Sequence, residues 1–111
     1  MSYSVFVTPK FKKEFKRLFK KYKSLNSDLN ELIDELSQNP TIGTDLGNNI
    51  YKVRLVISSK SKGKSGGARV ITYAKVNEFQ VLLLTIYNKG EKDSITNEEI
   101  RALKKEAGLE E

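Results

Sequence analysis

Basic side chains recur at alternate positions in residues 51–58, where their spacing could gather positive charge around a phosphate group. Apolar side chains alternate there with Lys52 and Arg54, the period-two pattern of a strand that turns one face to a core. Lys52 and Arg54 are therefore predicted to project from the same face. Arg69 lies near the start of the next strand-like run, and Tyr87 ends a third. Because arginine binds phosphate oxygens bidentately and a desolvated lysine can serve as a base, this set is a candidate cradle for a phosphodiester.

Each of these cations also has a simpler structural interpretation. Lysine and arginine on strands often solvate an open sheet face or discourage edge-to-edge pairing with other chains. For any single residue, this is the more common role of an exposed charge. The functional hypothesis therefore depends on the convergence of Lys52, Arg54 and Arg69 on one surface.

Two further groups of basic residues could contact nucleic acid. One lies in residues 58–67, where lysines alternate with serines and glycines that favour turns and leave nothing apolar to bury. The other lies in residues 10–23, where basic residues crowd around a single acid, Glu14, although a solvated helix face is the commoner explanation of such a pattern. The candidates for RNA contact are Lys60, Lys62 and Lys64 in the first group and Lys13, Arg17 and Lys20 in the second.

The composition limits the classes of function that the chain can perform. Its 111 residues fit one domain spanning 1–111, and a net charge of +6 favours an anionic partner. Without cysteine or histidine, the chain lacks a thiolate nucleophile, a disulfide, and the most frequent metal ligand and general base. No carboxylate cluster indicates a bound metal ion, so we expect neither metal nor cofactor. We find no signal peptide and no apolar run of membrane-spanning length, and we expect a cytoplasmic location.

Hydrophobic periodicity predicts a strand and two helices in the N-terminal part of the chain. Residues 3–7 have strand character, and Thr8 can cap a helix that carries an aromatic-rich core stripe. Asp28 with Glu31 resembles a capping box, which predicts the start of a second amphipathic helix that stops before Pro40. We expect the two helices to form an antiparallel pair. The predicted core stripe consists of Phe11, Phe15, Leu18, Phe19 and Tyr22.

The remaining chain is expected to form a loop, three strands and a final helix. Residues 41–49 are predicted to be a loop that leads into the three strands. The last strand, ending at Tyr87, is apolar on both faces and is therefore placed inside the sheet. Thr96 with Glu99 forms a second capping box, which begins the C-terminal helix. The resulting order is β-α-α-β-β-β-α, an α+β arrangement.

This order of elements and two short segments resemble the RelE/ParE superfamily of bacterial toxins from type II toxin-antitoxin modules. The segments are residues 51–55, Tyr-Lys-Val-Arg-Leu, and residues 67–73, where the family places an arginine entering a strand. The lysine-rich loop and residues 87–93 look most like the HigB-like branch, whose antitoxins often contain a helix-turn-helix domain. The resemblance covers essentially the whole chain. It implies a mainly antiparallel sheet, with the N-terminal helix pair packed on it and a C-terminal helix.

The resemblance also implies an activity, that of a ribosome-dependent endoribonuclease which enters the A site of the 30S subunit and cuts messenger RNA (an mRNA interferase). In this family the ribose 2′-hydroxyl attacks the adjacent phosphorus without a metal or other cofactor. The reaction requires a base, stabilisation of charge on the phosphorane, and a proton or counter-charge for the leaving 5′-oxygen.

Site residues are implied position by position. Lys52 becomes the candidate base, and Arg54 and Arg69 become candidate clamps on the non-bridging oxygens. Tyr87 becomes a candidate for stacking on or orienting a nucleotide. The family arginine that follows the last core strand aligns near residue 90, so its task would fall to Lys89 or Lys92. The resemblance therefore leaves the identity of the general acid open.

Two other functions compete with the ribonuclease. One is a ParE-like inhibitor that binds DNA gyrase without cutting nucleic acid, and the other is a module that has lost toxicity and binds only a partner or operator DNA. Because one fold hosts several activities, the fold does not decide among them. The set Lys52, Arg54 and Arg69 favours the nuclease, since a gyrase binder needs no phosphate cradle. The expected partners are a cognate antitoxin, the ribosome and messenger RNA, with no membrane.

Overall fold

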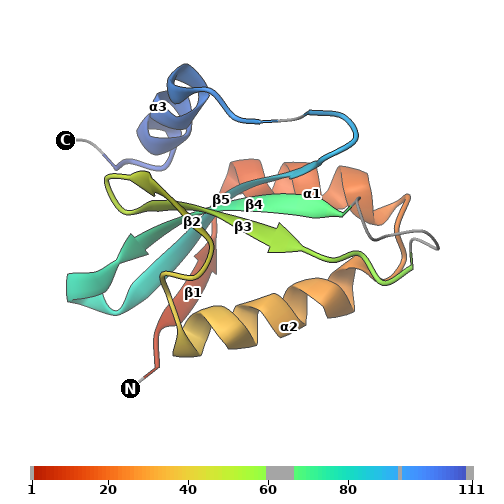
Figure 1. The fold of residues 1–111 in the computed structure, drawn as a ribbon, viewed down its shortest axis with the longest axis horizontal. Helices are drawn as coiled ribbons and strands as arrows, with labels where there is room; N and C mark the ends of the chain where they lie inside the picture. Colours follow the sequence, from red (N-terminus) through yellow and green to blue (C-terminus); the bar gives the residue numbers. More distant parts are fainter. Residues whose placement is uncertain (1, 60–66, 93, 110–111) are drawn as a thin grey trace.

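The computed structural model describes residues 2–59, 67–92 and 94–109, and the candidate RNA-contact residues Lys60, Lys62 and Lys64 lie outside them. The described elements form an α+β fold, as predicted (Figure 1). In chain order they are β1 (Ser4–Val7), α1 (Pro9–Phe19), α2 (Leu25–Gln38), β2 (Thr44–Gly47), β3 (Ile50–Leu55), β4 (Ala68–Lys75), a 3-10 turn (Val76–Glu78), β5 (Gln80–Asn88) and α3 (Asn97–Glu106). The sheet order is β1-β5-β4-β3-β2. Strands β1 and β5 are parallel and all other neighbours are antiparallel, so the sheet is mainly antiparallel, as predicted.

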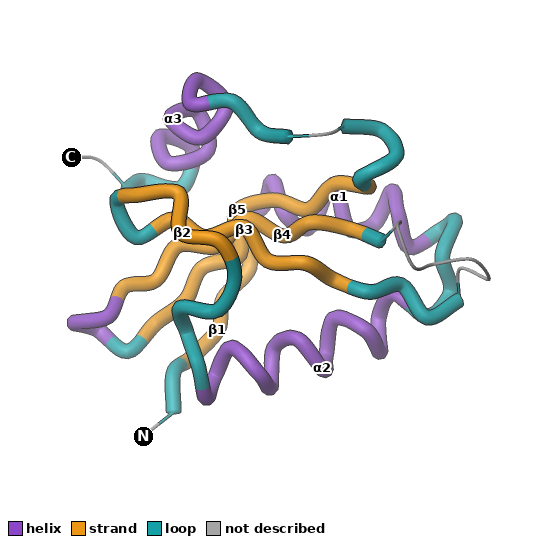
Figure 2. Tube along the Cα trace, in the orientation of Figure 1, coloured by secondary structure: helices purple, strands orange, loops and turns teal. Residues whose placement is uncertain are grey.

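Helices pack on both faces of the sheet. On one face, α1 and α2 bury apolar side chains against β3, β4 and β5, which confirms the predicted helix pair. On the other face, α3 packs on a smaller cluster that includes Ile71, Leu84 and Leu103. Figure 1 shows α2 and α3 on opposite sides of the sheet, and Figure 2 shows α2 running back after the turn that follows α1. We call the two surfaces of the sheet the helix-pair face and the α3 face.

Helix α1 begins where the sequence predicts. The hydroxyl of Thr8 accepts a hydrogen bond from the backbone N–H of Phe11 at 3.2 Å, which caps the helix. The same hydroxyl donates to the carbonyl oxygens of Leu83 and Leu84 at 3.0 and 3.1 Å. The cap therefore also attaches the first turn of α1 to the middle of β5.

The predicted aromatic stripe of α1 is buried only in part. Phe11 and Leu18 are fully buried, and Phe15 and Tyr22 are half-buried. Phe19 is 39% exposed, so the prediction that it belongs to the core is wrong. Eight residues of helix rotate the side chain by about 80° beyond two full turns, which places Phe19 at the border of the stripe that Phe11 defines.

Helix α2 begins at Leu25 with Ser24 at the N-cap position, four residues before the predicted cap, so the capping box predicted at Asp28 is wrong. Asp28 lies within the helix and is 5% exposed. Its carboxylate accepts hydrogen bonds from the backbone N–H and the hydroxyl of Ser58 at 3.0 and 2.6 Å, and from the hydroxyl of Ser24 at 2.7 Å. The carboxylate thus holds the chain that follows β3. The helix ends at Gln38, as the proline after it predicts.

The segment predicted as a loop, 41–49, contains an additional strand. Strand β2 pairs antiparallel with β3 across the two residues Asn48 and Asn49. Both asparagines have positive φ, 54° and 67°, as in the type I′ turns that join tightly paired strands. The predicted order is therefore short by one strand, because the turn was not recognised in the asparagine pair.

Strand β5 lies between β1 and β4, inside the sheet as predicted, and it contains a bulge. Ile71 lies opposite Thr85, but the next residue of β4 lies opposite Leu83, so Leu84 has no partner. Leu83 faces the helix pair and Tyr87 faces α3. Strict alternation would put both on the same face, so the extra residue is what turns Tyr87 to the α3 face.

Helix α3 begins with the predicted capping box, in which the side chains of Thr96 and Glu99 each bond the other's backbone N–H. Leu103 anchors its inner side in the cluster on the α3 face. Among the described helices, none is long and apolar enough to cross a membrane.

Candidate functional site

The predicted phosphate-binding cations lie on the α3 face of the sheet. Val53 packs on the helix-pair face, so strand alternation turns its neighbours Lys52 and Arg54 to the other side. Arg54 lies directly opposite Arg69 in the pairing of β3 with β4, and Arg69 lies directly opposite Tyr87 in the pairing of β4 with β5. These three side chains form one row across three strands.

Lys52 occupies the neighbouring row, opposite Ile71. Residues directly opposite one another have Cβ atoms about 4.5–5.5 Å apart, and successive residues on one face of a strand are about 7 Å apart. The flexible side chains of Lys52, Arg54 and Arg69, which we call the basic cluster, can therefore reach a single phosphate. Arg54 is exposed, while Lys52 and Arg69 are half-buried.

Two members of the basic cluster have no neutralising acid among the described residues. Within the described part of the chain, Lys52 and Arg69 form no ion pair. The guanidinium of Arg69 donates a hydrogen bond to the carbonyl of Ala68 at 3.1 Å. Like charges directly opposite one another destabilise a sheet. An anionic ligand bound at Arg54 and Arg69 would therefore reduce the repulsion between the two guanidinium groups.

Tyr87 is the buried end of this row of three side chains. It is only 6% exposed, so its ring does not offer an open stacking surface in this arrangement. The ammonium of Lys92 lies 5.5 Å from the centre of the Tyr87 ring, within cation–π range. The same ammonium forms an ion pair with Glu99, and this hydrogen bond lowers the pKa of Glu99 below its ordinary value.

Lys89 follows Tyr87 by two residues, and its backbone pairs with the residue before β4. Its backbone N–H donates to the carbonyl of Gly67 at 3.1 Å, which continues the β4–β5 ladder past Asn88. Lys89 itself is the first residue of the turn that follows β5. Gly67 has a φ of 93°, and a Cβ there would lie 2.8 Å from the carbonyl oxygen of Leu55, so only glycine fits this entry to β4.

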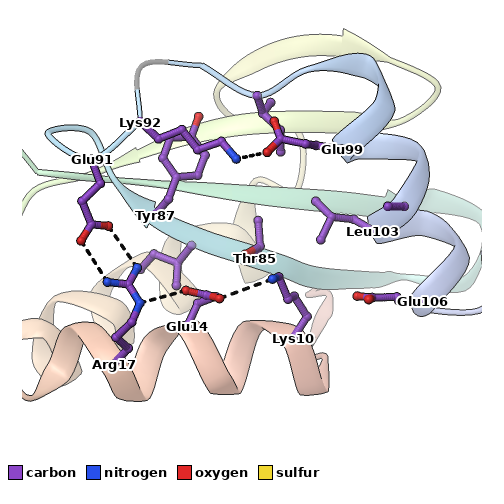
Figure 3. Close-up of a pocket in the computed structure, with 13 residues that line it drawn as sticks. Lys10, Glu14, Arg17, Thr85, Tyr87, Glu91, Lys92, Glu99, Leu103 and Glu106 are labelled. Carbon is purple, nitrogen blue, oxygen red and sulfur yellow. Dashed lines mark hydrogen bonds and ion pairs between the residues drawn. The ribbon is translucent and has the colours of Figure 1, made fainter.

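Arg17, a candidate for RNA contact, is bound to two carboxylates in this structure. Its guanidinium donates two hydrogen bonds to Glu91, at 2.9 and 3.0 Å, and one to Glu14, at 3.1 Å (Figure 3). Hydrogen bonds from Arg17 lower the pKa of Glu91. These groups line a pocket of about 360 Å³ between α1, β5 and α3, which Tyr87 and Lys92 also line.

The other two basic candidates of α1, Lys13 and Lys20, are exposed. They project from the helix, not from the strands that carry the basic cluster. The structure therefore brings together Lys52, Arg54, Arg69 and Tyr87, places Lys92 against the Tyr87 ring and Lys89 in the turn after β5, and leaves Lys13 and Lys20 apart. Within residues 2–59, 67–92 and 94–109, no three acidic side chains lie close enough together to hold a metal ion.

Several polar residues around the site were missed by the sequence analysis. Glu91 is 74 positions from Arg17, so no local spacing signals their contact. Glu99 was recognised only as a helix cap. Its bond to Lys92 joins the helix to a residue before it, and no periodic pattern in the sequence signals such a contact. Asn88 is 4% exposed and donates to the hydroxyl of Tyr22 at 2.9 Å. The only hint in the sequence was an asparagine directly after the long apolar run of β5.

Comparisons with known proteins agree with this fold. The model of the family described as "RelE toxin of RelE / RelB toxin-antitoxin system" matches residues 8–110. Among solved structures, an E. coli RelE toxin with two arginines replaced by alanine, in the free state, is 17% identical with a TM-score of 0.61, and the match covers 84% of this chain and 90% of that one. The intact E. coli RelBE toxin-antitoxin complex contains a chain that is 17% identical with a TM-score of 0.58, over 76% of this chain and 93% of that one. At this identity the solved structures show the shared fold, and the family match, which spans nearly the whole chain, shows that this protein belongs to the RelE toxin family of toxin-antitoxin systems.

Proposed function

We propose that this chain is a ribosome-dependent endoribonuclease that cuts messenger RNA in the A site without a metal ion. The observation that carries the proposal is the direct opposition of Arg54 and Arg69, with Lys52 in the next row of the same face. Family membership supports the class of protein, a toxin. The chemistry of the basic cluster supports the substrate class, a phosphodiester.

Cleavage would begin with attack of the ribose 2′-oxygen on the adjacent phosphorus. Lys52 would act as the general base that takes the proton of the 2′-hydroxyl as the new O–P bond forms. Arg54 and Arg69 donate hydrogen bonds to the non-bridging oxygens, where negative charge grows in the phosphorane. Their mutual repulsion falls as that charge develops, so the pair binds the transition state more tightly than the ground state.

Cleavage would end with loss of the 5′-oxygen from phosphorus. The P–O5′ bond breaks, and the leaving oxygen takes a proton from Lys89 or Lys92, which leaves a 2′,3′-cyclic phosphate on the upstream fragment. The ammonium of Lys92 lies over the Tyr87 ring, and the backbone of Lys89 is bonded to Gly67 at the entry to β4. The buried Tyr87 ring would serve to orient Lys92 and the nucleotide.

The proposal also names partners. A solved relative is the toxin of a RelBE toxin-antitoxin complex, and we propose that this chain likewise has a cognate antitoxin, which neutralises the basic cluster with acidic or helical segments. The ribosome and its messenger are the proposed targets, which places the action in the cytoplasm.

The first prediction is that the purified protein cuts messenger RNA only when the messenger occupies the ribosome. Toe-printing of a defined messenger on purified ribosomes, with an empty A site, should show new ends within the A-site codon. The upstream ends should carry cyclic phosphate or its hydrolysis product. An intact messenger together with trapped gyrase–DNA complexes would overturn the proposal in favour of a gyrase inhibitor.

A further inference from the structure

The segment from the last residue of β5 through the turn after it, residues 88–92, is tied to helix α1 and the turn after α1 at two points. The amide nitrogen of Asn88 donates to the hydroxyl of Tyr22 at 2.9 Å. Glu91 receives both arms of the Arg17 guanidinium, at 2.9 and 3.0 Å. Figure 3 shows this second contact bridging from α1 to the chain beyond Tyr87. Lys89 lies between the two points of attachment, and Lys92 comes directly after them.

The segment is also folded on itself. The side chain of Asn88 accepts a hydrogen bond from the backbone N–H of Gly90 at 3.0 Å. The backbone N–H groups of Glu91 and Lys92 donate to the carbonyls of Asn88 and Lys89, at 2.9 and 3.3 Å. This is a compact turn, and the two contacts with α1 fix its position relative to the sheet.

Stability alone is a weak explanation of the Arg17–Glu91 contact. The two side chains are 49% and 42% exposed, and exposed ion pairs add little to the stability of a fold. Their geometry is nevertheless specific, because a bidentate contact between guanidinium and carboxylate fixes both distance and orientation. Glu14 adds a third hydrogen bond to the same guanidinium at 3.1 Å.

We infer that Arg17 and Glu91 are positioning residues for cleavage, and that they hold the turn which carries Lys89 and Lys92 at the edge of the basic cluster. The inference rests on the proposed ribonuclease function. It gives Arg17 a task different from RNA contact, since its donors are already directed at Glu91 and Glu14. Loss of the contact would let the turn move, and a misplacement of about 1 Å in a reacting group can cost on the order of 100-fold in rate.

The test is a charge exchange measured by single-turnover cleavage of messenger on saturating ribosomes. Arg17→Glu and Glu91→Arg should each slow the cleavage step about 10- to 100-fold, with ribosome affinity nearly unchanged. The double variant carrying both changes restores the pair and should recover most of the rate. The matched control is Lys12→Glu, which makes the same charge change at an exposed position of α1 and should cut at the wild-type rate. If Arg17→Glu does not fold, Arg17→Gln removes the ion pair with less disturbance.

A second readout does not depend on activity. Hydrogen exchange at the backbone amides of Glu91 and Lys92 should be faster in Arg17→Glu and should return to wild-type protection in the double variant. If the wild-type protein cuts but the Arg17 variants cut equally fast, the inference is overturned while the ribonuclease proposal stands. If the double variant stays slow, the loss is not due to this contact and the inference is overturned. If the wild-type protein itself does not cut, the ribonuclease proposal fails, and the amide exchange still decides whether the contact holds the turn.

Discussion

Arg54 and Arg69 face each other where β3 and β4 pair, and this position is costly for two positive charges. Directly opposed like charges weaken a sheet by about 0.2–1 kcal/mol relative to neutral pairs. An anionic ligand bound at this position would reduce the repulsion between the two guanidinium groups. Elsewhere on the molecule, cations such as Lys10 and Arg17 are paired with carboxylates. At the scale of single residues, Lys10 and Arg17 are balanced by carboxylates, whereas Lys52 and Arg69, where we propose that RNA binds, form no ion pair within the described residues.

Asp28 supports a prediction about pH. Burial alone would raise its pKa, but hydrogen bonds from Ser58 and Ser24 outweigh burial and lower the pKa below its ordinary value. Because the folded pKa lies below the unfolded one, ionised Asp28 stabilises the fold at neutral pH. This contribution is lost as pH falls from about 4 through the folded pKa. Asp28→Asn should therefore lower the free energy of unfolding at pH 7 by about 1–3 kcal/mol.

Urea denaturation from pH 7 to pH 3 measures this effect. The difference in unfolding free energy between Asp28→Asn and the wild type should shrink as the pH drops below about 4. Asp34→Asn, at an exposed position of the same helix, is the control and should differ little from the wild type at any pH. A difference for Asp28→Asn that stays constant across this range would show that the charge of the carboxylate is not what stabilises Ser58.

The residues of the site were predictable to the extent that they follow a local period. Alternation in residues 51–58 is enough to put Lys52 and Arg54 on one face. The contact of Arg17 with Glu91 joins positions 74 apart and has no such signature. The bond that Ser58 donates to Asp28 joins positions 30 apart and has no such signature either. The carboxylate of Asp28 is used in this contact and does not cap the helix.

At the scale of elements, helices and central strands were predictable because their hydrophobic patterns are long. Strand β2 was missed because it has only four residues and one half-buried apolar side chain, Leu46. The bulge at Leu84 lies in a run that is apolar on both faces, so alternation there carries no information. Yet the bulge decides that Tyr87 faces the α3 side. The bulge at Leu84 thus determines that Tyr87 lies on the same face as the basic cluster.

The turn between β2 and β3 gives a prediction at this scale. Asn49 has a φ of 67°, a left-handed conformation that glycine and asparagine tolerate and that β-branched residues strongly disfavour. Asn49→Val should lower the melting temperature by about 4–8 °C, whereas Asn49→Gly should leave it unchanged or raise it. Thermal unfolding by circular dichroism makes the comparison, with Thr44→Val in exposed β2 as control. Equal melting temperatures for the two Asn49 variants would mean that this turn does not set the pairing of β2.

In the molecule as a whole, the sheet has the larger hydrophobic core on one face and the proposed catalytic residues on the other. The helix-pair face is covered by α1 and α2 and contains the larger core. The α3 face is covered only in part, since α3 packs around Leu84 and Leu103 while Arg54 remains exposed. The chain carries a net charge of +6. In the proposed function, this net positive charge favours encounter with the anionic ribosome, and the basic cluster acts on one phosphate there.

The most direct measurement of the central claim is single-turnover cleavage of ribosome-bound messenger by Arg69→Ala, with thermal unfolding of the same preparation. We predict a loss of at least about 100-fold in the cleavage rate, since a donor to the developing charge is removed. The melting temperature should not fall, because the repulsion with Arg54 is removed as well. Arg101→Ala, at an exposed position of α3, should keep the wild-type rate. Unaltered cutting by folded Arg69→Ala would contradict the account.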